Sequence, residues 1–144
     1  MGNINWGRFL ATCAVVTIII FVLDIVFHAW IVPGMYAGYP QRPQAEIAGL
    51  IPFLFLTYIV QITLFCLMYL FIYPRRGMAS AVFWALWGGF FVVIPNMQFF
   101  VGVAGTTWAL LLVQVVEAIV LLVLGMIVFE LAYRPRTSQS ASKS

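Results

Sequence analysis

Charged side chains are scarce in this 144-residue sequence: 8% of the residues are Asp, Glu, Lys or Arg, whereas 65% are hydrophobic. A soluble domain carries about 25% charged residues, and a short chain exposes much of its surface when it folds. The composition therefore excludes an ordinary soluble domain and indicates lipid as the surrounding solvent. The net charge of +3 does not indicate a nucleic-acid partner, because the basic residues lie near the ends of apolar segments.

Histidine and cysteine are also rare, with one His and two Cys in the chain. Two thiols without His partners do not form a zinc site, so we interpret Cys13 and Cys66 as small packing residues without a disulfide. A single His excludes bis-histidine haem ligation within one chain. Walker A, G-x-S-x-G and H-E-x-x-H motifs are absent from the sequence, so no cofactor is indicated.

Long apolar runs are what the sequence has instead, in four segments at about 7–32, 46–72, 78–103 and 107–133. Each segment exceeds the roughly 20 residues that a helix needs to cross a hydrocarbon core of about 30 Å. Backbone groups cannot remain unpaired in lipid, so each segment is predicted to be a helix. The sequence therefore predicts an all-α, integral membrane four-helix bundle over residues 1–136, in up-down-up-down order. Residues 137–144 are predicted to be a disordered cytoplasmic tail.

Basic residues are distributed unequally between the two sides of such a bundle. The side with both termini and the second connection carries six of them: Arg8, Arg75, Arg76, Arg134, Arg136 and Lys143. The other side carries only Arg42. The positive-inside rule then predicts that both termini are cytoplasmic.

Among the ionisable residues inside the apolar segments, three are the main candidates for a site: Asp24, His28 and Glu117. A charged side chain in the hydrocarbon costs at least roughly 2.5–3.5 kcal/mol, so these groups are expected to face the bundle interior or a wet cavity. Asp24 and His28 are four residues apart and therefore share one face of the first helix. Glu117 is expected near the bilayer centre, and Asp24 in the outer half.

The ionisable residues are expected to form a polar cluster with amide side chains of the third and fourth segments. This cluster is predicted to open toward the outer side. Its binding candidates are Asp24, His28, Asn96, Gln114 and Glu117, with Arg42 as the nearby cation. Asp24, His28 and Glu117 would also offer two oxygens and one nitrogen to a first-row metal. The alternative is structural, in which the polar groups hold the helices together and Arg42 pairs with Glu46 at a helix start.

Two further features of the third segment predict how it packs. Ala81, Ala85 and Gly88-Gly89 follow near-helical spacing, which predicts a close helix–helix seam, either within one chain or between copies. Pro95 predicts a kink near the outer end of this helix, or the end of the helix itself.

Several short motifs occur in a fixed order along the chain. They are Asp-x-x-x-His at 24–28, Arg-Pro-x-x-Glu at 42–46, Arg-Gly at 76–77, a glutamate at 117 and Tyr-Arg-Pro at 133–135. In these motifs the chain resembles an uncharacterised family of small four-span bacterial integral membrane proteins. The resemblance covers nearly the whole chain and implies the four-span fold and a bacterial inner-membrane location. It implies no activity.

Three functional interpretations follow, in order of preference. The first is a small membrane protein that binds or transports a proton, a cation or a small ligand through the outward-facing polar cluster. The second is an accessory or structural subunit of a homo-oligomer or larger membrane complex, in which the cluster only specifies packing. The third is a metal or quinone redox enzyme. All three have the lipid bilayer as a partner.

Overall fold

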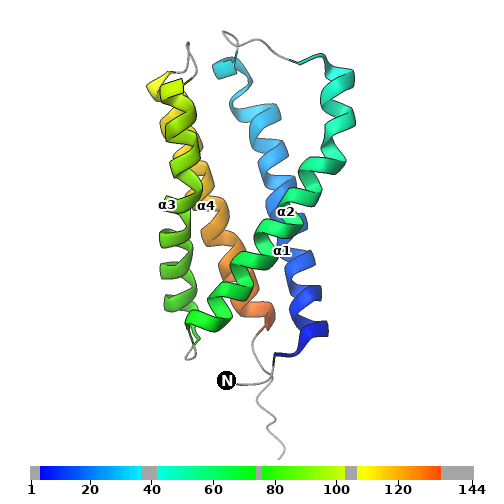
Figure 1. The fold of residues 1–144 in the computed structure, drawn as a ribbon, viewed down its shortest axis with the longest axis vertical. Coiled ribbons are helices and arrows are strands. Elements are labelled where there is room, and N and C mark those ends of the chain that lie inside the picture. Colours follow the sequence, from blue (N-terminus) through cyan, green and yellow to red (C-terminus); the bar gives the residue numbers. More distant parts are fainter. Residues whose placement is uncertain (1–3, 37–41, 74–75, 103–106, 134–144) are drawn as a thin grey trace, which may run out of the picture.

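A computed structural model of the chain describes residues 4–36, 42–73, 76–102 and 107–133, without some side chains near the end of the third long helix. The described part is built from helices and turns, which confirms the all-α class. The long helices are α1 (Trp6–Val26), α2 (Gln44–Ile72), α3 (Met78–Gly102) and α4 (Trp108–Tyr133). They run up, down, up and down as one bundle (Figure 1). A π-helical turn, η1 (Phe27–Ile31), continues α1, and a 3₁₀ turn, η2 (Pro33–Tyr36), follows it.

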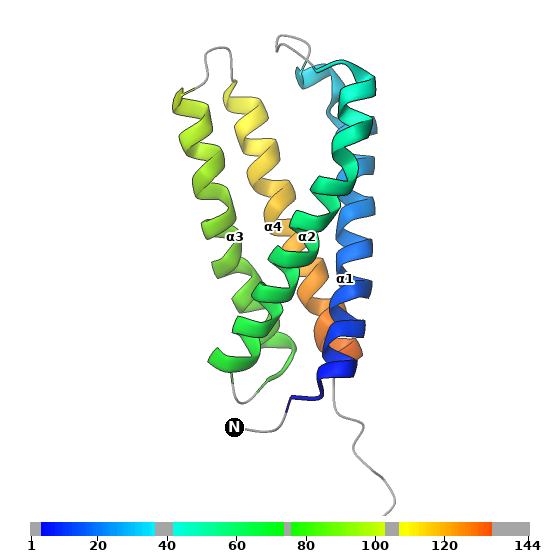
Figure 2. The same ribbon diagram turned by 45° about the vertical axis from the view of Figure 1, so that its right-hand side comes forward.

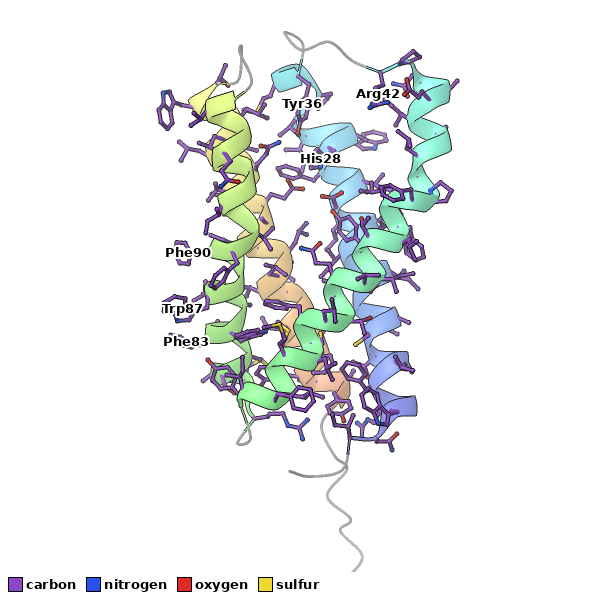
Figure 3. The ribbon with its side chains drawn as sticks, viewed as in Figure 1. His28, Tyr36, Arg42, Phe83, Trp87 and Phe90 are labelled. Carbon is purple, nitrogen blue, oxygen red and sulfur yellow. The ribbon has the colours of Figure 1, made fainter. Side chains whose placement is uncertain are left out.

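The outer surface of the bundle is apolar. Within the described residues, three helical spans are long and apolar enough to cross a membrane: α1 with η1, α2, and α4. On α3, Phe83, Trp87 and Phe90 share one helix face and point away from the other helices (Figure 3), each more than half exposed. A soluble protein does not present apolar patches of this extent to water, so the surface suits lipid.

One sequence-based expectation about the helix ends needs correction. The first apolar segment is not one regular helix to residue 32, because Val32 N–H donates to the carbonyl of Phe27, five residues earlier, at 3.3 Å. That spacing defines a π-turn. Of the two alternatives predicted for Pro95, the helix end is not observed, since α3 continues to Gly102. The predicted tail at 137–144 lies outside the described residues.

The two ends of the bundle are packed differently. We call the end with the first turn of α1 and the last turn of α4 the closed end, and the opposite end, with η2, the open end. Buried apolar side chains from all four helices fill the closed half: Phe9, Cys13, Val16, Ile20, Ile62, Cys66, Tyr69, Ala81, Ala85, Leu122, Met126, Phe129 and Tyr133. Cys13 and Cys66 are free thiols within this core, in agreement with their predicted packing role.

The small residues of α3 form a seam within the chain. Ala81 and Ala85 are fully buried. A Cβ atom added to Gly88 would lie 2.1 Å from the ring of Phe65 on α2, and one added to Gly89 would lie 2.9 Å from Ile119 on α4. Of the two arrangements predicted for this seam, the structure therefore has the one between helices of a single chain.

Polar contacts tie the closed end together. The Arg8 guanidinium donates to the carbonyl oxygen of Ala132, from Nη2 at 2.7 Å and from Nε at 3.1 Å. This cation pairs one of the carbonyls that the last turn of α4 leaves free. The Tyr69 hydroxyl lies 3.1 Å from both Glu130 Oε2 and Ser80 Oγ, and so connects α2, α3 and α4.

The open half is splayed. Figure 2 shows α2 and α3 close together at the closed end and apart at the open end. Every residue from 42 to 54 is exposed, so the first three turns of α2 contact little of the bundle. Pro52, inside this stretch, removes one backbone hydrogen bond, and Figure 1 shows α2 bending in this half. The divergence leaves a cavity among the helices.

Candidate functional site: a polar cavity in the open half

The cavity has a volume of about 220 Å³ and is bounded by all four helices. Its lining residues are Ile20, Asp24, His28, Tyr58, Gln61, Ile62, Val92, Gln114, Glu117, Ala118, Leu121 and Leu122. Gln61 is exposed and His28 is partly exposed, so the cavity reaches the surface of the bundle. Ile20 and Leu122 form its floor, because both belong to the apolar core of the closed half.

Three ionisable side chains meet in this cavity. His28 Nδ1 lies 3.5 Å from Asp24 Oδ1 and 3.4 Å from Glu117 Oε1. The nearest donor atoms of all three residues lie within 4.8 Å of one another. We call Asp24, His28 and Glu117 the triad.

The local structure of two helices produces the triad. Asp24 lies in the last turn of α1, and His28 follows in the π-turn η1, where the chain still places the two side chains on the same side. π-turns are frequent at functional sites. Glu117 comes from the middle of α4, which packs along α1, and is only 8% exposed. The triad therefore depends on the contact between the first and last helices.

Hydrogen bonding in the triad is incomplete. His28 Nδ1 lies 3.1 Å from the backbone carbonyl of Asp24, so that carbonyl is the natural acceptor of a proton on this nitrogen. Glu117 Oε1 lies 3.4 Å from the same nitrogen, a contact that is an ion pair only with a protonated imidazole, and among the described residues this buried oxygen has no hydrogen-bond partner. A buried carboxylate oxygen without a donor costs free energy. The arrangement therefore has room for a proton, a cation or water beside Glu117.

Tyrosines cover the triad on two sides. The Tyr36 ring of η2 stacks on the His28 imidazole, with 5.9 Å between centroids and 26° between planes, and both residues lie at the open end (Figure 3). Gln114 Nε2 donates to the Tyr36 hydroxyl at 3.3 Å. From α2, Tyr58 lines the same cavity as Asp24. The polar wall thus extends beyond the triad to Tyr36, Tyr58 and Gln114.

The structure brings together four of the six predicted binding candidates: Asp24, His28, Gln114 and Glu117 all line the cavity. Arg42 does not line it. Arg42 is exposed at the start of α2 and pairs with Glu46, one turn later, away from His28 (Figure 3). Asn96 belongs to α3, but its side chain lies outside the described part of the structure.

Sequence reasoning did not assign Tyr36, Tyr58 or Glu130. Tyr58 and Gln61 are three residues apart on α2, and this shared helix face could have indicated a polar wall. Tyr36 resembled an ordinary interfacial aromatic residue, and only its stacking on His28 reveals its place. Glu130 is 5% exposed near the end of α4, where it accepts a hydrogen bond from Tyr69.

The charge of the triad limits what it can bind. With His28 neutral and both carboxyls ionised, the triad carries two negative charges in a largely apolar bundle, where charge is costly unless it is balanced. A cation, or protons, would balance that charge.

Comparison of the chain with protein-family models, with curated proteins and with solved structures finds no match. The resemblance to small four-span bacterial membrane proteins therefore stays a prediction, and the site is interpreted from its own geometry.

Proposed function

We propose that this protein binds a small cation, the proton included, at the triad of Asp24, His28 and Glu117, and exchanges it through the open end. The observation that carries the proposal is the Glu117 carboxyl: it is 8% exposed, close to His28, and has one oxygen without a hydrogen-bond donor in the described part of the chain. Ionisable groups inside membrane helices usually mark ion or substrate pathways, because packing alone rarely compensates their cost.

Access to the site is expected from one side of the membrane. The polar cavity lies in the splayed half, whereas large buried side chains such as Phe9, Tyr69 and Phe129 fill the closed half. The excess of basic residues at the closed end supports a cytoplasmic position for that end. The triad would then exchange its cation with the outer side of a bacterial inner membrane.

Thermal unfolding of the purified protein in detergent tests this proposal. The midpoint would be measured across pH and with sodium, an organic ammonium ion, magnesium and zinc, for the unmodified protein and for Glu117→Gln. We expect at least one of these cations, or the proton, to shift the midpoint of the unmodified protein, and Glu117→Gln to reduce that shift. Glu46→Gln is the matched control, because Glu46 is an exposed carboxyl outside the cavity. Identical responses of all three proteins would overturn the proposal.

A role as an accessory subunit is the second candidate, and the exposed stretch from 42 to 54 favours it. That stretch is exposed on every face, so a helix of another membrane protein could pack there as readily as lipid. Cross-linking through Phe53→Cys in native membranes distinguishes the two candidates. Cross-links to one defined protein, together with cation responses that do not depend on Glu117, would favour the accessory role.

A further inference from the structure

We infer that the triad is a binding site for one divalent first-row transition metal ion, with Asp24, His28 and Glu117 as its protein ligands. This inference rests on the proposed function, because it names the class of cation that the same site takes. It depends on the spacing of the donor atoms, on the mixture of donors, on charge and on the space beside them.

The donor atoms of the triad are spaced like the ligands of one metal ion. Oxygen and imidazole ligands bind zinc at about 2.0–2.2 Å, so two ligands in a tetrahedral arrangement lie about 3.4 Å apart. His28 Nδ1 lies 3.5 Å from Asp24 Oδ1 and 3.4 Å from Glu117 Oε1. Both nitrogen–oxygen distances therefore already match the distance between two ligands of one tetrahedral metal ion. The ligand atoms of the two carboxyl groups are within 4.8 Å of each other.

The buried carboxyl is an independent indication of a ligand. Glu117 Oε1 has no hydrogen-bond donor among the described residues and lines the polar cavity. The nearest cationic partner of this oxygen is His28 Nδ1 at 3.4 Å, and that contact is an ion pair only when the imidazole is protonated. Beside a neutral imidazole the oxygen has no donor, which is costly where water is absent. A metal ion on the His28 side of the oxygen supplies the missing partner.

The donor set selects among divalent ions. Calcium and magnesium prefer sites made only of oxygen, and magnesium usually keeps several waters. One imidazole with two carboxylates instead suits manganese, iron, cobalt, nickel or zinc. Two carboxylates and a neutral imidazole also balance a double positive charge, which leaves a neutral complex inside the apolar bundle.

The surrounding residues fit a metal site with open positions. A cavity of about 220 Å³ is much larger than one ion, so water can complete the coordination. Tyr58 lines the cavity together with Asp24, and Tyr36 stacks on the imidazole, so both can help to orient a ligand side chain. Residues of this kind fix ligand geometry in known metal sites.

Cobalt(II) is the probe for the test, because its visible absorption reports the number and type of its ligands. Untagged protein in detergent would be titrated with cobalt chloride at pH 7.5, followed by zinc competition and elemental analysis. We expect one cobalt ion per chain with visible bands, displaced by zinc and unaffected by excess magnesium. His28→Gln and Glu117→Gln should each weaken cobalt binding at least about tenfold, as loss of even an outer-shell partner does in other sites. Glu46→Gln should bind like the unmodified protein.

Folding must be controlled, since each ligand variant could disturb the bundle. Asp24→Asn keeps the size of the side chain and removes one charged oxygen, and size-exclusion profiles and helical circular dichroism would be compared for all variants. Failure of the folded, unmodified protein to bind cobalt, or binding that His28→Gln leaves unchanged, would overturn the inference. If cobalt does not bind but the unfolding midpoint still responds to another cation or to the proton through Glu117, the proposed function stands without the metal. If neither response occurs, both are overturned.

Discussion

Glu117 of α4 faces His28 of η1 across the contact between the first and last helices, with Oε1 3.4 Å from Nδ1. Asp24 Oδ1 lies 3.5 Å from the same nitrogen. One imidazole nitrogen therefore contacts two carboxyl groups, and each carboxyl can substitute in part for the other. This relationship makes the three residues a single energetic unit.

A double-mutant cycle measures that unit. We expect Asp24→Asn and Glu117→Gln to be non-additive, with the double variant less stable than the sum predicts by about 0.5–3 kcal/mol. Removing one carboxyl relieves repulsion between the pair and leaves His28 one partner, whereas removing both leaves it none. The free energy of unfolding would be measured by denaturation in mixed micelles. The control cycle, Glu46→Gln with Glu117→Gln, should be additive within about 0.5 kcal/mol. Additivity in both cycles would separate Asp24 from Glu117.

The glycine seam predicts a contrast between two chemically identical substitutions. Gly88→Ala should destabilise the bundle by about 1–3 kcal/mol, because the new methyl group would lie 2.1 Å from the Phe65 ring. That ring stacks on Trp84 at 5.1 Å between centroids, so it would have to leave this stacking contact to make room for the methyl group. Gly49→Ala, in the exposed part of α2, has no atom within 4 Å and should be neutral or stabilising by up to about 1 kcal/mol. Equal unfolding free energies for the two variants would contradict this packing.

Two tyrosines on α2 should separate stability from cation binding. Tyr69→Phe removes the donor to the buried Glu130 carboxyl and should cost about 1–3 kcal/mol of stability. Its cobalt affinity should not change, because Tyr69 belongs to the closed half and does not line the cavity. Tyr58→Phe, which alters the polar wall beside Asp24, should weaken cobalt binding instead. If Tyr69→Phe weakened cobalt binding and Tyr58→Phe did not, the site would lie in the closed half and not in the cavity.

Cysteine labelling tests the orientation. With Cys13 and Cys66 replaced by Ala, a membrane-impermeant maleimide should label Gln41→Cys in intact cells and should label Ser140→Cys only after lysis. The expectation rests on the positive-inside rule, with six basic residues on one side and Arg42 on the other. Labelling of Ser140→Cys from outside would reverse the orientation and place the open end toward the cytoplasm.

The helical class and part of the triad could be predicted from sequence alone. Segment length and the need to pair every backbone group in lipid lead directly to helices. Asp24 and His28 are brought together by a local rule, the spacing of four residues along a helix. The convergence of Glu117 on the same place could be predicted only from the cost of burying a lone carboxyl, and not from any pattern in α4.

Other features depend on tertiary geometry, which the spacing of residue types along the sequence does not indicate. The π-turn at Phe27–Ile31 has the same apolar composition as a regular helix, so its hydrogen-bond register is invisible in the sequence. The stacking of Tyr36 on His28 joins two turns whose relative placement depends on the whole bundle. The sequence offered Arg42 two possible partners, the nearby Glu46 and the more distant polar cluster. In the structure Arg42 pairs with Glu46.

The contact between α1 and α4 also has a consequence for biosynthesis. A nascent chain emerges from the ribosome with its N-terminal part first, so α1 enters the membrane while α4 has not yet been translated. During that interval Asp24 and His28 lack Glu117, and Arg8 lacks the Ala132 carbonyl that accepts its hydrogen bonds. Until the last helix arrives, a partly hydrated position costs these side chains of the first helix less than the hydrocarbon core does. A ribosome stalled before residue 117 would leave the first half of the site in the membrane without its partner.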